Sequence, residues 1–545
     1  MKKLFIALAC ALSLAACSQA PKTTVCENPL TYTDIPDNDV IRVGNDYYMV
    51  STTMYFCPGA PIMHSTDLVH WEIVNYVFDT IVDNDAINLR NGQSAYGKGQ
   101  WATSLQYNNG TYYILFISND QPGQTFVYTT KDIVNGSWER HVLDRQFHDC
   151  SLLFDGDRTF AIYGNGQIHL TELTLDAFAI KEGGIDEVII TTPEGFNLRD
   201  EGARAYKIGD WYYVLTINWP TGGVRTETAW RAKEITGPYE RKDILQGKFD
   251  GRNDGVAQGP IFETQNGDWY AMMFQDHGGV GRIPTLQPVT WVDEWPILGD
   301  NTVPVKTFEV NLPEGGENYT WASDEFDSSE LALVWQWNHK PLNDCWNVAD
   351  GKLNLTTGHI AEGIVTARNS LTQRTVGPRC WSETMVDVSA LKPGDAAGLC
   401  AFQSSYGRIG VDVDAEGNKF LVAVHRKAGR KPLVENADPR DRSQWMMVNG
   451  RADGGEEELL RMPLDQDKVW LKVRYVFTAV EEGETSDEAF LSYSLDGQNW
   501  TELEQPLKMS FALDFFTGYR SALYCYATIE TGGKASFDYF HQEAY

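Results

Sequence analysis

The sequence is short of basic residues. Its 545 residues include 45 Lys and Arg against 75 Asp and Glu, which gives a formal net charge of −30. Binding to phosphate backbones or anionic headgroups needs clustered Lys and Arg, so nucleic acid is excluded as a partner. After the first 20 residues no apolar run reaches the ~18 residues that cross a bilayer. Aromatic residues make up 12% of the chain, which excludes long disorder and favours two or more well-packed domains.

Cysteine is also scarce. Seven cysteines follow Cys17; they are widely spaced, odd in number and form no C-x-x-C pair. Neither a metal cluster nor a disulfide framework is therefore expected, and most of them should be small buried residues. One bridge within the C-terminal region stays open as an alternative in an oxidising compartment.

The N-terminus reads as an export signal. Lys2 and Lys3 precede an apolar stretch over residues 4–12, and Leu14-Ala15-Ala16-Cys17 resembles a bacterial lipobox. We expect residues 1–17 to be a lipoprotein signal peptide, Cys17 to carry the lipid and the polar residues 18–25 to form a tether. The chain would then be an exported bacterial lipoprotein, periplasmic or on the outer membrane or cell surface, touching the membrane only through this anchor. An ordinary cleaved signal with a chance cysteine is the alternative.

A hairpin motif recurs along the first half of the chain. A polar turn followed by an aromatic β-type run appears five times, and its equivalent residues are Tyr48, Tyr113, Phe160, Tyr213 and Tyr270. The steps between them are 65, 47, 53 and 57 residues, close to the ~40–50 of a propeller blade with insertions. The pattern predicts a five-bladed β-propeller over residues 27–312. The alternative is a β-sandwich with coincidental hairpins.

The pattern changes after a Pro- and Gly-rich stretch at residues 311–320. From there to Tyr545 the sequence contains many short alternating strands, such as residues 471–478, joined by turns such as Asp496-Gly497. This arrangement predicts a β-sandwich over residues 321–545. The expected fold class is therefore all-β, with a propeller followed by a sandwich.

Three acidic residues stand at similar positions before these hairpins. Asp37 lies 11 residues before Tyr48, Asp149 lies 11 before Phe160, and Glu201 lies 12 before Tyr213. Any one of them could be a solvated carboxylate or a turn cap. Three in register predict that they meet at one height on the propeller axis, where the innermost strand of each blade should begin.

These residues carry a family resemblance that spans almost the whole chain after the signal. Residues 27–300 resemble glycoside hydrolase family 43 through a set of motifs: PDNDVIRVG, WATSL, HDCSLLFDGD, DEGARAYKIGDWYYVLT, ITGPYE and FQDHGGVGR. The part that begins at Asp324 is similar to the concanavalin-A-like sandwich that follows the propeller in the β-xylosidase and α-L-arabinofuranosidase branches.

The resemblance implies an inverting hydrolase. Asp37 would be the general base that activates water, Glu201 the general acid, and Asp149 the residue that orients the acid and adjusts its proton affinity. Inverting hydrolysis needs room for a water between base and acid, so their carboxyl groups should lie ~6.5–9.5 Å apart.

Further residues are implied by the same resemblance. Trp101 would form a sugar platform, although a core tryptophan is the alternative, and Arg282 would reach a substrate hydroxyl. Gln258 stands where many members have a histidine near a bound ion, and we expect it to replace that histidine by hydrogen bonding. The departure puts an axial calcium in doubt, and no cofactor or metal is expected to be required.

The sequence thus predicts an exo-acting enzyme that releases terminal α-L-arabinofuranose, β-D-xylose or both from arabinoxylan, xyloglucan or arabinan. The sandwich is expected to narrow the funnel of the propeller to a pocket. An endo-arabinanase, which needs an open groove, is one alternative. A catalytically silent glycan-binding surface lipoprotein is another; it would keep the aromatic residues and lose the carboxylates.

Overall fold

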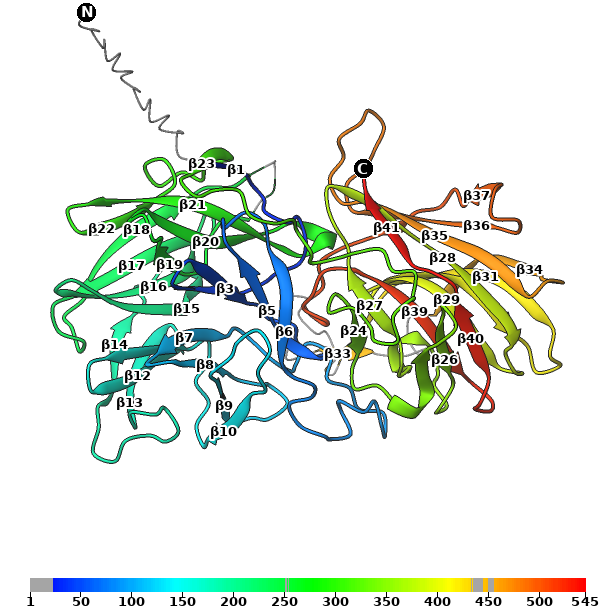
Figure 1. Ribbon diagram of the computed structural model, residues 1–545, viewed down its shortest axis with the longest axis horizontal. Helices are drawn as coiled ribbons and strands as arrows, with labels where there is room; N and C mark the ends of the chain where they lie inside the picture. The colour runs from blue at the N-terminus through cyan, green and yellow to red at the C-terminus, as the bar shows by residue number, and fades with distance from the viewer. Residues whose placement is uncertain (1–22, 250–251, 253, 433, 435–444, 449–454) are drawn as a thin grey trace, which may run out of the picture.

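The computed structural model describes residues 23–545 except 250–251, 253, 433, 435–444 and 449–454 (Figure 1). Cys17 and the rest of the expected signal lie outside the described residues. Within the described ranges there is no α-helix, and nothing helical is long and apolar enough to cross a membrane. The short 3-10 helices are η1 (Gly278–Val280), η2 (Asn343–Cys345) and η3 (Ile364–Thr366).

The first half of the chain forms five four-stranded antiparallel sheets, drawn from blue to green in Figure 1. Blade one contains β2 (Asp39–Val43), β3 (Asp46–Val50), β5 (Gly59–Ser65) and β6 (Glu72–Phe78). Blade two contains β7 (Ser104–Asn108), β8 (Thr111–Phe116), β9 (Thr125–Thr130) and β10 (Glu139–Leu143). Blade three contains β11 (Ser151–Asp155), β12 (Arg158–Asn165), β13 (Gln167–Leu173) and β14 (Asp186–Thr191).

Two more blades complete the ring. Blade four contains β15 (Phe196–Ile208), β16 (Trp211–Pro220), β17 (Thr226–Ala232) and β18 (Glu240–Gln246), and blade five contains β19 (Ile261–Glu263), β20 (Trp269–Asp276), β21 (Arg282–Val292) and β22 (Trp295–Leu298). The first strand of each blade lies nearest the axis, where neighbouring first strands contact one another. Strands β1 (Thr24–Glu27) and β23 (Thr307–Val310) pair and bring the two ends of this half together.

The predicted five-bladed propeller is confirmed. Each of the five aromatic hairpin residues lies in the second strand of its blade, in β3, β8, β12, β16 and β20. Alternating apolar residues in these strands fill the space between adjacent blades, as Tyr48 does against Tyr112 of the next blade. The repeat in the sequence is therefore the repeat of the fold.

The starting point predicted for Glu201 needs a correction. Asp37 and Asp149 stand two residues before β2 and β11, as expected, whereas Glu201 lies inside β15, which begins at Phe196. Glu201 pairs with Ile217 and Arg204 with Leu215, so a bulge holds one extra residue between them. This residue explains the offset of 12 in place of 11, because the bulge returns Glu201 to the height of the other two carboxylates.

The second half is a sandwich of two large sheets, on the right of Figure 1. One sheet has the order β34 (Glu456–Pro463), β31 (Lys419–Arg426), β30 (Tyr406–Val413), β29 (Asp395–Phe402), β39 (Arg520–Ala527), β27 (Leu371–Arg374), β24 (Gln336–Asn338) and β4 (Phe56–Cys57). Its buried face packs on the other sheet through one apolar core that includes Leu399 and Leu471.

The other sheet runs β25 (Trp346–Val348), β26 (Leu353–Thr356), β40 (Lys534–Phe537), β28 (Arg379–Ala390), β35 (Lys468–Val476), β36 (Glu488–Ser494) and β37 (Trp500–Glu502). Strand β38 (Leu507–Lys508) pairs with β36, and β41 (His541–Ala544) pairs with β28. A separate ribbon joins β32 (Gly429–Pro432) to β33 (Trp445–Val448). The seven cysteines of the described part are all free, and six are buried.

The two halves share a sheet. Strand β4 comes from the propeller half of the chain, yet it is the edge strand of the sandwich sheet, where Cys57 pairs with Trp337. Beside it, Tyr55 stacks on His339 with ring centres 4.8 Å apart, and Tyr96 and Phe515 complete the cluster. Burial lowers the pKa of His339 to about 3, so its ring is neutral and packs as part of an aromatic core.

Because this cluster belongs to both halves, we expect its loss to destabilise the chain as one unit. Tyr55→Ala leaves a cavity and should lower the free energy of unfolding by about 3–5 kcal/mol. Chemical denaturation followed separately by fluorescence and by far-UV circular dichroism measures this. Tyr319→Ala, whose side chain is 42% exposed, is the control and should change little. Two separated transitions, with only the first shifted, would contradict a shared core.

Candidate active site

The three predicted carboxylates gather at one end of the propeller axis. Asp37 and Asp149 both have left-handed backbone, with φ of 51° and 49°. This conformation is uncommon outside glycine and is least costly for Asn and Asp. It occurs immediately before an inner strand in both cases. The backbone is therefore shaped to present these two side chains, at a cost that is common at functional sites.

Asp37 is held by a guanidinium. Arg282 Nη1 donates to Asp37 Oδ1 at 2.7 Å, and Arg282 Nε donates to Asp276 Oδ1 at 3.1 Å. Burial opposes ionisation of Asp276, but the charges of Arg282 and Arg225 outweigh it and lower its pKa. Asp276 thus keeps a negative charge that fixes Arg282 against Asp37. This is the setting of a carboxylate that works as an anion.

Gln258 lies beneath the same carboxylate. Its Nε2 is 3.4 Å from Asp37 Oδ1, and its backbone N–H donates to Glu227 Oε2 at 2.7 Å. Its exposed fraction is 5%, so the side chain is buried beside Asp37. A hydrogen-bonding role in place of the family histidine agrees with these contacts.

The other side of the site contains two residues that the sequence reasoning did not single out. Asn165, at the end of β12, donates through Nδ2 to Glu201 Oε2 in a short hydrogen bond. His148 Nε2 lies 3.7 Å from Glu201 Oε2 and 3.8 Å from Asp149 Oδ2. The sequence offered a signal for His148, which stands next to Asp149 in the HDCS motif. It offered none for Asn165, which lies in a hairpin outside the motifs.

The charges of this group depend on one another. The negative charge of Asp149 raises the pKa of His148 to about 9 against the opposition of burial, and Glu201 contributes in the same direction. Burial raises the pKa of Asp149 to about 6, although His148 opposes the shift. At neutral pH an imidazolium therefore lies between two acidic side chains.

The same three residues could in principle hold a cation, because ligand atoms of His148, Asp149 and Glu201 lie within 4.8 Å of one another. A metal ion binds the neutral imidazole, so binding there would release a proton from His148.

The sandwich contributes an aromatic wall. Phe516, from the loop between β38 and β39, stacks on Trp101 with ring centres 5.2 Å apart, and the Arg282 guanidinium lies 4.6 Å from its ring centre. Phe511 lies 5.7 Å from the same guanidinium. A loop of the sandwich thus reaches the end of the propeller where the carboxylates lie. Trp101, the expected sugar platform, lies between Phe516 and His148 and is only partly buried.

A buried carboxylate fixes the three parts of the site together. Asp34 Oδ1 accepts a hydrogen bond from the backbone N–H of Arg282, and Oδ2 accepts one from that of Gly518, both at 2.8 Å. Gly281 is required beside it: its φ is 105°, and a Cβ there would lie 2.2 Å from Asp34 Oδ1. Asp34 stands three residues before Asp37, so base, guanidinium and aromatic loop share one anchor.

Comparison with known proteins agrees with this geometry. Residues 26–296 match the model of glycosyl hydrolases family 43, and residues 323–543 match that of the β-xylosidase C-terminal concanavalin A-like domain. The chain belongs to glycosyl hydrolases family 43. It is therefore a glycoside hydrolase, and the resemblance found in the sequence is confirmed.

Similar proteins include members from several bacteria. The chain is 26% identical to a β-xylosidase of Formosa agariphila over 94% of this chain and 89% of that protein. It is 28% identical to a non-reducing-end α-L-arabinofuranosidase of Bacteroides ovatus over 63% of this chain and 67% of that protein. The solved structure of a bifunctional GH43-CE protein of Bacteroides eggerthii is 39% identical with a TM-score of 0.84; the match covers 96% of this chain and 64% of that one.

The charge on His148 should make the stability of this family 43 enzyme depend on pH. Its pKa rises on folding from the ordinary 6.5 to about 9. The stabilisation is therefore complete below about pH 6.5 and is lost as pH rises through about 9. We expect the difference in unfolding free energy between wild type and His148→Gln to fall between pH 6.5 and 9.5 in denaturant titrations.

The matched control is Asn165→Ala, which removes the other neighbour of Glu201 without removing a titrating group. Its stability difference from wild type should stay the same over this pH range. A His148→Gln difference that is equally constant would mean that His148 carries no charge near the carboxylates.

Proposed function

We propose that this glycoside hydrolase is an exo-acting, inverting enzyme that releases terminal α-L-arabinofuranose, β-D-xylose or both from hemicellulose glycans. The observation that carries the proposal is the unequal setting of two carboxylates at one funnel. Asp37 faces a fixed guanidinium, whereas Glu201 shares its side of the funnel with a second carboxyl group, that of Asp149. The guanidinium favours the anionic form that accepts a proton, and two neighbouring carboxyl groups favour the retention of a proton that one of them can deliver.

The reaction follows from these roles. Asp37 takes a proton from water while the water oxygen bonds to the anomeric carbon. As the bond from that carbon to the leaving oxygen breaks, Glu201 passes its proton to the leaving oxygen. The attack comes from the face opposite the leaving group, so the configuration at the anomeric carbon inverts. Asp149 and His148 orient Glu201, and their charges influence how readily it gives up its proton.

Removal of terminal sugars is supported by the loop from the sandwich. Phe516 and Phe511 pack over Arg282 and against the Trp101 side of the funnel, which narrows the approach to the carboxylates. A narrowed approach accommodates a chain end better than the middle of a polymer. This favours exo action over the endo-arabinanase alternative. The retained carboxylates with their partners favour an enzyme over a silent binding protein.

Both pentoses are included because the named relatives act on both. A β-xylosidase and an α-L-arabinofuranosidase match this chain at 26% and 28% identity. Aromatic and amide groups at the funnel are suited to stack on and hydrogen-bond either sugar. Product analysis on linear oligosaccharides tests the exo action: only monosaccharide should appear at early times, and release of longer fragments would refute it.

The acid and base roles make different predictions for substrates with good leaving groups. Glu201→Gln should lose most activity on natural linkages and retain much more on a dinitrophenyl pentoside, because that leaving group needs no proton. Asp37→Asn should lose activity severely, at least 10³-fold, on both substrates, because neither can replace the activation of water.

The measurement is kcat/KM for each variant on dinitrophenyl pentoside and on xylobiose or arabinobiose, with the product anomer followed by NMR. Gln93→Ala, an exposed amide outside the funnel, is the control. Equal losses of kcat/KM for Glu201→Gln on activated and natural substrates would contradict the assignment of Glu201 as the general acid. A retained anomeric configuration would remove the inverting mechanism.

We also propose that the chain is exported and anchored by lipid on Cys17. The support is the N-terminal sequence alone, with its two lysines, apolar stretch and Leu14-Ala15-Ala16-Cys17. Labelling cells with a radioactive fatty acid should mark the wild-type chain and leave Cys17→Ser unlabelled. Equal labelling of both chains, or no labelling of either, would contradict the anchor.

A further inference from the structure

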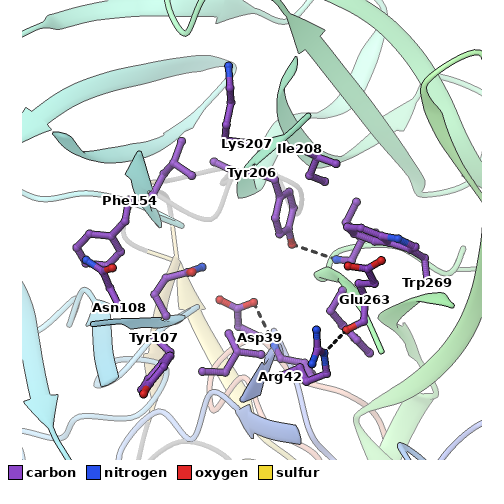
Figure 2. Close-up of a pocket in the computed structure, with 17 residues that line it drawn as sticks. Asp39, Arg42, Tyr107, Asn108, Phe154, Tyr206, Lys207, Ile208, Glu263 and Trp269 are labelled. Carbon is purple, nitrogen blue, oxygen red and sulfur yellow. Dashed lines mark hydrogen bonds between the residues drawn. The ribbon is translucent and has the colours of Figure 1, made fainter. Parts of the chain in front are cut away.

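A second cavity lies at the other end of the propeller axis (Figure 2). Its volume is about 430 Å³, and all five inner strands line it. Asp37 and Asp149 stand before β2 and β11, and Glu201 lies at a similar height inside β15, whereas the cavity is lined by later residues of the inner strands, such as Arg42, Asn108 and Phe154. The two sites are therefore on opposite mouths of the ring.

Arg204 closes the axis between them. Its side chain is 1% exposed; Nη2 is 3.2 Å from the carbonyl oxygens of Asn38 and Thr103, and Nε is 3.4 Å from Asp39 Oδ1. Asp39 in turn faces the cavity (Figure 2). A molecule in this cavity thus has no direct route to Asp37 and would not be a substrate in the act of cleavage.

The cavity presents amides that nothing in the protein uses. Gln106 and Asn108 lie on β7 and line it, and their side chains have no hydrogen-bond partner among the described residues. Arg42 donates hydrogen bonds from Nε to the carbonyl oxygen of Glu263 and from Nη1 to that of Gly44. Free amides offer donors and acceptors together, which matches vicinal hydroxyl groups.

Aromatic rings stand around the same opening. Tyr107, Phe154 and Trp269 surround it in Figure 2, and Tyr107 is 42% exposed. Tyr107 packs against Tyr112 and Trp269 against Trp291, with ring centres 4.7 and 5.2 Å apart, so each ring is supported from within the blade. Exposed aromatic rings are the surfaces on which the C–H faces of sugars stack.

The charges around the cavity are mixed. Arg42 lines it with a positive charge and the exposed Glu263 with a negative one. The Lys207 amine lies 3.6 Å from the ring centre of Tyr212, and the buried Asp39 accepts hydrogen bonds from backbone N–H groups, so neither is offered to a ligand. An anionic ligand would meet the Glu263 carboxylate, and a cation would meet the Arg42 guanidinium. A neutral polyhydroxyl ligand can hydrogen-bond to both kinds of group without a charge penalty.

We infer that this rear cavity binds a neutral oligosaccharide segment of the glycan, apart from the site of cleavage. The inference rests on the proposed function, since it assigns the polymer that this enzyme trims as the ligand. Binding there would hold the enzyme on the polymer between cleavage events and would raise the concentration of chain ends near the funnel.

The test uses the full chain made inactive by Glu201→Gln, so that oligosaccharides bind without cleavage. Isothermal titration with xylohexaose and with arabinohexaose should give two sites per chain for at least one of them. Adding Gln106→Ala and Asn108→Ala should remove one site or weaken it at least tenfold. Arg42→Ala, a second variant in the cavity, should weaken the same site. Gln93→Ala with Gln505→Ala, two exposed amides elsewhere, is the matched control and should keep both sites.

In the active chain, Gln106→Ala with Asn108→Ala should leave kcat/KM on a nitrophenyl pentoside unchanged and lower the rate on dilute arabinoxylan severalfold. A single binding site in the Glu201→Gln chain, or two sites unaffected by the cavity variants, would overturn the inference. Activity of wild type on nitrophenyl pentosides reports separately on the proposed function, so the two can fail independently.

Discussion

The carboxylate of Asp34 is the contact on which the rest of the site depends. A buried carboxylate is costly unless its oxygens are satisfied, and here the backbone N–H groups of Arg282 and Gly518 satisfy one oxygen each. The backbone oxygen of Asp34 also accepts a hydrogen bond from Arg374 Nε at 3.0 Å. Three distant segments therefore meet at one residue, and their relative positions follow from the geometry of a single side chain.

The two halves of the chain consequently complete one another. The propeller supplies β4 to the edge of the sandwich sheet, and the sandwich supplies Phe516 to the mouth of the propeller. Neither exchange involves many residues. Both lie against the buried cluster that includes Tyr55. The surroundings of the three carboxylates are thus formed by the pair of domains together.

The sequence predicted what is local and repeated. Apolar and polar residues alternate with period two in the aromatic hairpins, so the sequence indicates each blade. Counting back from the hairpins predicted that Asp37, Asp149 and Glu201 lie at one height. Even the one-residue discrepancy at Glu201 has a local cause, the bulge in β15. Contacts between distant segments have no pattern in the sequence that predicts them. Asp34 and Gly518 are 484 positions apart, and β4, with two residues, is too short to show an alternation. His148 was visible in a motif, but its position between two carboxylates depends on how three blades and their turns converge.

The left-handed backbone at Asp37 and Asp149 restricts how these positions can evolve. After glycine, asparagine and aspartate adopt that conformation at the smallest cost, so most other side chains would add strain whatever their chemistry. Neutral drift at either site should therefore pass mainly through asparagine and glycine. A descendant that had lost hydrolysis but kept the fold would be recognisable by those two residues, and it could regain activity by a single codon change.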